Sequence, residues 1–130
     1  MITLERAQAL ITAGIKEATD QGLALAFAVV DSAGHPVASA RMDGAPWIAP
    51  EVALGKAWTA AAYGAPSAAQ GEKMQSLHAF SASISVATGG RYTPQIGGLP
   101  ITDGGTLVGA IGASGGTGQQ DEDVVRAALG

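Results

Sequence analysis

The run Arg41-Met42-Asp43-Gly44 places a cation, a carboxylate and a glycine directly after a predicted strand. A guanidinium can hold a carboxylate through two charge-assisted hydrogen bonds, and a neighbouring glycine lets a ligand approach the backbone closely. The run therefore predicts an anion-binding point, with Arg41 as the cation and Asp43 as a ligand contact or a candidate acid or base. The same pattern is also typical of an exposed arginine followed by a turn aspartate.

Lys56, Thr59 and Tyr63 recur at intervals of three and four residues, so they share one face of a helix predicted over residues 52–63. Lys56 is the only basic residue in this alanine-rich stretch. It could bind an acidic ligand or move a proton. It could equally extend its ammonium group to solvent across apolar neighbours.

Ser114 lies in the string GASGG at residues 112–116, which matches the G-x-S-x-G pattern of serine hydrolases. Those enzymes need a histidine after the serine, whereas His35 and His78 both precede Ser114. We therefore interpret the string as a glycine-rich turn, in which Ser114 contacts a ligand and does not act as a nucleophile.

The chain has no cysteine, so thiolate ligands and cysteine nucleophiles are excluded. Its two histidines are not spaced to bind one metal ion together, and we predict no metal site apart from a haem iron. His35 lies in a turn predicted at residues 31–36 and should be exposed. His78, near Met74 and Phe80, could face a planar apolar cofactor and offer its imidazole to iron, or it could be an ordinary partly buried histidine.

The composition favours an oligomer. Charged residues make up only 14% of the chain, against a usual quarter or so, and a surface with few charges leaves apolar area that a subunit interface can cover. We therefore predict a homo-oligomer, a dimer or larger.

The net charge of -4 and the scattered basic residues exclude a nucleic-acid partner. No apolar run approaches the roughly 18 residues of a membrane span, and the N-terminal stretch does not resemble a signal peptide, so we expect a cytoplasmic protein.

The pattern of elements predicts one domain over residues 1–130, of the α+β class. Thr3 should cap a first helix that stops at Gly22, and Ser67 with Gln70 suggests a capping box that opens a third helix. Asp103-Gly104 predicts a hairpin turn. Residues 81–86 fit a strand or a helix, and their pattern does not decide between them. The other predicted elements are strands at 23–30, 37–42, 99–101 and 106–113, and helices at 52–63 and 121–129.

Several strings together resemble the GlcG/HbpS-like family, which includes haem-binding proteins of the HbpS type and the C-terminal domain of PduO-type proteins. They occur in the family's order and span about residues 25–125, which is nearly the whole chain. The resemblance implies a profilin-like or PAS-like antiparallel sheet flanked by helices, assembled into closed oligomers. The strings are VDSAG at 30–34, ARMDGA at 40–45, KAWTA at 56–60, GGLPI at 97–101, and GAIGASG at 109–115 followed by QDE at 120–122.

The family further implies a small-ligand binding domain whose ligand is haem or a related tetrapyrrole, held against the sheet or at a subunit boundary. The carboxylates of such a ligand would meet Arg41, Lys56 or Arg91, with Thr59 and Gly98 beside them. Because the strand bearing Arg41 leads into the helix bearing Lys56, we expect these two cations to share one pocket. If they do not, Arg91 and Tyr92 are the next candidates.

Two alternatives remain open at this point. The first is an enzyme or accessory protein that acts on a small organic acid in a catabolic pathway. Arg41 and Lys56 would then bind the carboxylate, and Asp43, Lys56 or Asp121 would move a proton. The second alternative is a structural oligomer without a ligand.

Overall fold

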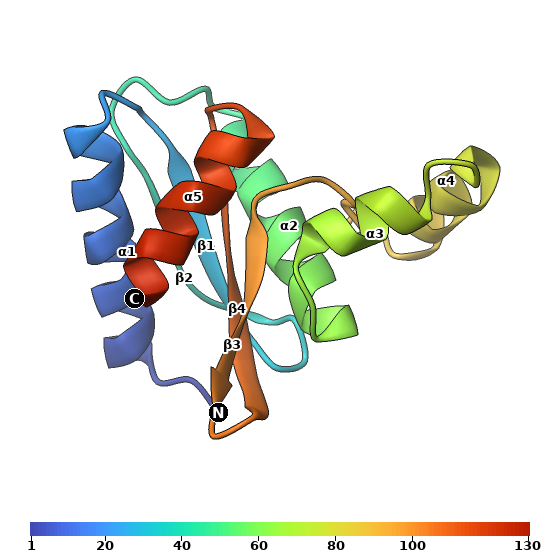
Figure 1. Ribbon diagram of the computed structural model, residues 1–130, viewed down its shortest axis with the longest axis horizontal. Coiled ribbons are helices and arrows are strands. Elements are labelled where there is room, and N and C mark those ends of the chain that lie inside the picture. The colour runs from blue at the N-terminus through green and yellow to red at the C-terminus, as the bar shows by residue number, and fades with distance from the viewer.

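A four-stranded antiparallel sheet forms the centre of the protein, which a computed structural model describes over residues 1–130 (Figure 1). The strands lie in the order β2-β1-β4-β3, so that the two hairpins of the chain sit side by side. This arrangement confirms the α+β class and the antiparallel sheet flanked by helices. The strand bounds are Ala26–Asp31 for β1, Pro36–Arg41 for β2, Gly98–Asp103 for β3 and Thr106–Ser114 for β4.

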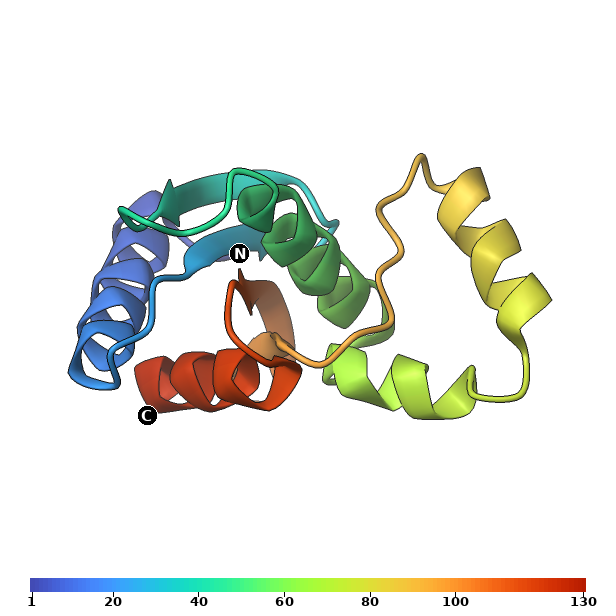
Figure 2. The ribbon, with the colours of Figure 1, turned by 90° about the horizontal axis from the view of Figure 1, so that it is seen from above.

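Helices cover both faces of the sheet. Helices α1 (Leu4–Asp20) and α5 (Gly118–Leu129) lie on one face, and α2 (Ala49–Tyr63) lies on the other, as the view from above shows (Figure 2). Along β1, the side chains alternate between the two layers, as they must in a strand. Phe27 and Val29 join the main core with α1 and α5, whereas Val30 packs with the alanines of α2.

The contact between α2 and the sheet is close because glycine and alanine line it. A Cβ atom added at Gly112 on β4 would lie 2.3 Å from the carbonyl oxygen of Ala53 on α2, so only glycine fits there. The small alanine side chains of α2 therefore allow the helix to lie close to the sheet. A larger residue at either position would push the helix off the sheet.

The helix ends follow local signals in the sequence, with one exception. Thr3 caps α1 as expected, its side-chain oxygen accepting a hydrogen bond from the Arg6 N–H group at 3.1 Å. Helix α5 begins at Gly118, earlier than predicted, because Thr117 and Gln120 form a capping box that sequence reasoning missed. The capping box predicted at Ser67 is wrong. Helix α3 (Ser67–Lys73) follows Pro66, and the Ser67 hydroxyl binds elsewhere.

Residues 81–86, which the sequence pattern left undecided, belong to helix α4 (His78–Ala87). Both views show α4 standing away from the body beyond α3 (Figures 1 and 2). Helix α4 packs against no other helix or strand, and none of its residues is buried. We call residues 74–90 the arm. No helix of the structure is both long and apolar enough to cross a membrane.

Candidate functional site

Two adjoining hollows on the α2 side of the molecule form a cavity that combines aromatic, imidazole and charged side chains. We call it the Arg91 groove. The hollows share Pro36, Leu54 and Arg91, and their volumes are 480 and 390 Å3. Each lies within the range of about 300–1,000 Å3 that is usual for small-molecule sites. The first hollow adds Ala33, Gly34, His35 and Trp58, and the second adds Ser39, Pro50, Glu51, Gly55, Gly89 and Gly90.

The turn between β1 and β2 rests on the indole ring of Trp58. Gly34 has a φ of +85°, a conformation that side chains other than glycine rarely adopt. A Cβ atom at Gly34 would also lie 2.7 Å from Cδ1 of Trp58, so the turn can approach the ring only because glycine is there. Trp58, which is partly buried, also lines the first hollow of the groove.

His35 is exposed, as expected, and is paired with a carboxylate that sequence reasoning missed. The Asp31 carboxylate accepts hydrogen bonds from the backbone N–H groups of His35, at 3.0 Å, and of Ala33, at 2.9 Å. These hydrogen bonds lower the pKa of Asp31 below its usual value of 3.8, and the bond from His35 has the largest effect. The group is therefore charged at neutral pH. Its other oxygen lies 3.6 Å from Nδ1 of His35. The four-residue spacing of Asp31 and His35 is the sequence signal from which this pair could have been predicted.

Lys56 and Asp121 form a buried ion pair. The Lys56 ammonium lies 3.0 Å from Oδ2 of Asp121 and donates a second hydrogen bond, also 3.0 Å, to the carbonyl of Ala113. The second Asp121 oxygen accepts a hydrogen bond of 2.9 Å from the Gly116 N–H group. The two side chains are only 5% and 2% exposed, and Lys56 lines no hollow of the structure. The pair therefore ties α2, β4 and α5 together.

Arg41 and Asp43 are both exposed, and they line a separate 390 Å3 hollow with Ile15 and Met42. No hollow is lined by both Arg41 and Lys56, so the expectation that they share one pocket is wrong. The strand order explains the separation. Arg41 ends the edge strand β2, whereas the Lys56 ammonium is held by a carbonyl of β4, which lies beyond β1.

Thr59 and Gly98 anchor the segment that carries Arg91. The Thr59 hydroxyl donates to the Gly55 carbonyl and accepts from the Thr93 N–H group, both at 2.8 Å. The Gly98 N–H group donates to the Ser67 hydroxyl at 2.9 Å. These bonds fasten residues 93–98 to α2 and α3. The structure thus places Thr59 and Gly98 among the groups that position Arg91.

Tyr92, next to Arg91, is fully enclosed. Its hydroxyl donates a hydrogen bond of 2.9 Å to the side-chain carbonyl of Gln70, and its ring meets that of Tyr63 edge-on at 6.0 Å. Burial raises the pKa of the Tyr92 hydroxyl above its usual value. Tyr92 therefore holds the segment in place, while the exposed Arg91 side chain lines the groove.

Ser114 and His78 lie outside the groove. Ser114 is the partly buried last residue of β4, opposite Ala26, and no histidine bonds to its hydroxyl. His78 is the exposed first residue of α4 and lines none of the hollows. Neither residue contacts the groups that the Arg91 groove brings together.

Comparison with known proteins gives a consistent match along the chain. A family model described as "Haem degrading protein HbpS-like" matches residues 2–130. The protein GlcG of Escherichia coli (strain K12) is 34% identical over 114 residues, which cover 88% of this chain and 81% of GlcG. The crystal structure of the Klebsiella pneumoniae protein ORFY has a TM-score of 0.90 and 32% identity, over 98% of this chain and 88% of ORFY. A PduOC:heme complex has a TM-score of 0.88 and 25% identity, over 98% and 92% of the two chains.

Proposed function

Because the chain belongs to the HbpS-like family of haem degrading proteins, we propose that it binds haem or a related tetrapyrrole in the Arg91 groove. The observation that carries the proposal is the meeting of a planar indole, an imidazole and a guanidinium in one hollow: Trp58, His35 and Arg91. No other hollow of the structure combines these three groups. A solved relative in complex with heme, at 25% identity, supports the same ligand class.

Each of the three groups suits one part of a tetrapyrrole. Arg91 can bind a propionate through charge-assisted hydrogen bonds, and the Trp58 ring can pack against the macrocycle. His35 can offer a ring nitrogen to iron while its Nδ1 faces the Asp31 carboxylate, an arrangement that commonly orients ligating histidines. Bound haem would supply an iron that can exchange electrons and take up oxygen.

The proposed iron ligand differs from the candidate that the sequence offered. His78 was the sequence candidate, but it begins the arm and lines no hollow, whereas His35 lies in the groove with Arg91. We therefore place the iron at His35. The proposal also includes a homo-oligomer, which the low fraction of charged residues and the uncovered helix α4 both support.

One observation favours the alternative of a protein that acts on a small organic acid: Arg41 and Asp43 line the same hollow. Arg41 could hold a carboxylate there, and Asp43 could exchange a proton. Lys56 and Asp121 do not support this alternative, because they are buried in an ion pair with each other. A panel of small carboxylic acids that raises the melting temperature of the wild type, and not of Arg41→Met, would support it.

Haemin titration tests the main proposal. The expected result is a saturable Soret band for the wild type. Arg91→Met should weaken binding by roughly ten- to a hundredfold, the equivalent of one lost charged hydrogen bond. His35→Ala should alter the position of the Soret band, and His78→Ala, the matched control, should not. A flat titration of the wild type, or a band that only His78→Ala alters, would contradict the proposal.

A further inference from the structure

Helix α4 has a glycine C-cap but little else that stabilises a short helix: Gly89, at a φ of +67°, and Gly90 donate hydrogen bonds to the carbonyls of Val86 and Ser85. It has ten residues, no side chain caps its N-terminus, and no acidic residue lies in its first turn. Its sequence HAFSASISVA is rich in serine and β-branched residues, which are mediocre helix formers. Isolated helices shorter than about 12–15 residues are marginal in water, because most helical stability in proteins comes from packing of an apolar face. Its own chain gives α4 a hydrogen bond from the Ser85 hydroxyl to the Tyr92 carbonyl but no packed face, so a surface that covers its exposed apolar side chains would stabilise it.

The arm exposes three large apolar side chains. Leu77, Phe80 and Val86 are 44%, 56% and 81% exposed. The seventeen residues 74–90 contain no aspartate, glutamate, lysine or arginine. A nucleic acid or an anionic lipid surface would require basic side chains here. Because the arm exposes apolar side chains and has no acidic or basic residue, it fits an uncharged, largely apolar partner surface.

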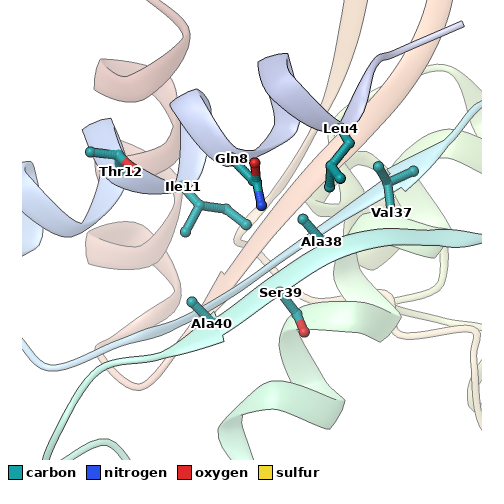
Figure 3. A pocket seen from close by; sticks show the side chains of 8 residues that line it. All are labelled: Leu4, Gln8, Ile11, Thr12, Val37, Ala38, Ser39 and Ala40. Atoms are coloured by element: carbon teal, nitrogen blue, oxygen red, sulfur yellow. The ribbon is translucent and has the colours of Figure 1, made fainter.

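Such a surface exists on the same chain, at the other end of the molecule. A hollow of 470 Å3 lies between α1 and the edge strand β2, and none of the residues lining it is charged. Leu4, Gln8, Ile11 and Thr12 line it from α1, and residues 37–40 line it from β2. In Figure 3 the side chains of Leu4, Gln8 and Ile11 extend toward β2, whereas that of Ser39 points away from α1. Leu4 is 53% exposed, and the outer edge of β2 pairs with no strand. We call this feature the α1–β2 hollow.

The arm cannot reach its own α1–β2 hollow. Helices α1 and α4 lie at opposite ends of the molecule in both views, and they make no contact (Figures 1 and 2). Each chain therefore carries two uncovered, uncharged surfaces that match each other in chemistry but are kept apart by the fold. A second copy of the chain carries both surfaces, so each copy offers the other a surface of matching chemistry.

We propose that the arm docks into the α1–β2 hollow of a second copy of this chain. This inference rests on the proposed homo-oligomer and adds which two surfaces meet. It also connects assembly to the ligand site, because the arm ends at Gly89 and Gly90, which line the Arg91 groove. Docking would hold this end of the arm and thereby fix the wall of the groove that precedes Arg91.

Charge placed on the arm tests the proposal. Phe80→Glu and Val86→Glu should each shift the wild-type oligomer toward monomer, with self-association weakened at least tenfold, since a carboxylate would have to be buried in a hollow that offers no cation. Ala13→Glu, which adds the same charge to the exposed side of α1, is the matched control and should assemble like the wild type. Sedimentation velocity measures assembly, and circular dichroism verifies that each variant is folded.

The outcomes separate the two proposals. A monomeric wild type would overturn both the homo-oligomer and the arm docking. An oligomeric wild type together with oligomeric Phe80→Glu and Val86→Glu would overturn only the docking and leave the oligomer in place. Haemin binding is measured independently, so neither result depends on the ligand.

Cross-linking tests the counter-surface directly, because the wild type has no cysteine. Phe80→Cys and Gln8→Cys variants, refolded together and oxidised, should give a disulfide-linked dimer that contains one copy of each, identified by mass. Gln8 lies in the α1–β2 hollow. Phe80→Cys with Ala13→Cys, the control pair, should stay unlinked. A dimer formed efficiently by Phe80→Cys alone would show that arms meet arms, and would overturn docking into the hollow.

Discussion

Removing the ammonium group of Lys56 should destabilise the protein strongly. In Lys56→Met, the Asp121 carboxylate loses its only cation while remaining 2% exposed, and the Ala113 carbonyl loses its side-chain donor. At the 3.0 Å separation of the pair, with an effective dielectric constant of about 20, the lost attraction is roughly 5.5 kcal/mol. Breaking one partner of a buried pair typically costs about 3–5 kcal/mol. We expect a loss in that range.

Thermal and urea unfolding measure this loss. A cost of about 3–5 kcal/mol should lower the melting temperature by about 10–20 °C in a chain of this size. Lys16→Met is the control, because it breaks the Lys16–Asp20 pair, whose side chains are 77% and 56% exposed. That change should lower the melting temperature only slightly, because exposed ion pairs contribute little to stability.

A double variant distinguishes a lost ion pair from a packing defect. Lys56→Met with Asp121→Leu removes both charges, so it should recover at least half of the stability lost by Lys56→Met alone. Recovery stays incomplete because the Gly116 N–H group and the Ala113 carbonyl lose their partners. If Lys56→Met unfolds like the wild type but binds an acidic ligand poorly, the lysine serves a ligand, and the reasoning from the buried pair is refuted.

Two further predictions concern the turn beside the groove and the end of β4. Because hydrogen bonds from His35 and Ala33 lower the pKa of folded Asp31, the charged carboxylate stabilises the protein above its unfolded pKa near 3.8, and that stability disappears as the pH falls through the folded pKa. Urea unfolding from neutral pH down to about pH 3 should therefore show Asp31→Asn less stable than the wild type at neutral pH, with the difference shrinking in acid; a constant difference would contradict this. Ser114→Ala should keep its free energy of unfolding within about 1 kcal/mol of the wild type and bind haemin unchanged, whereas stoichiometric labelling of Ser114 by a serine-directed phosphonate would contradict the interpretation that it is not a nucleophile.

The fold could be predicted because its signals are local. The Thr3 cap, the left-handed Gly64 that ends α2 and the Asp103-Gly104 turn each depend on residues within a few positions of one another. Strand and helix periodicities are equally local, so most element bounds came within a few residues of the structure. The family resemblance was also readable, because its strings are contiguous and occur in order.

Helix α4 could not be decided from the sequence. Alternation of serine with apolar residues at 81–86 fits a strand as well as one side of a helix, and helix propensity there is low. The missing information lies outside the segment. If the arm docks on a second copy, the packing that stabilises α4 is supplied by another molecule, and no pattern within ten residues can encode it.

The role of Lys56 and the identity of the groove depended on tertiary structure alone. A lysine in an alanine-rich helix has the same local sequence whether it extends to solvent, binds a ligand or pairs with Asp121, which lies 65 residues further along the chain. Likewise, His35, Trp58 and Arg91 come from three separate segments and show no common spacing. Local sequence determined which elements form, because short-range backbone and capping energies dominate there. Which side chains meet was decided only when the sheet order brought distant elements together.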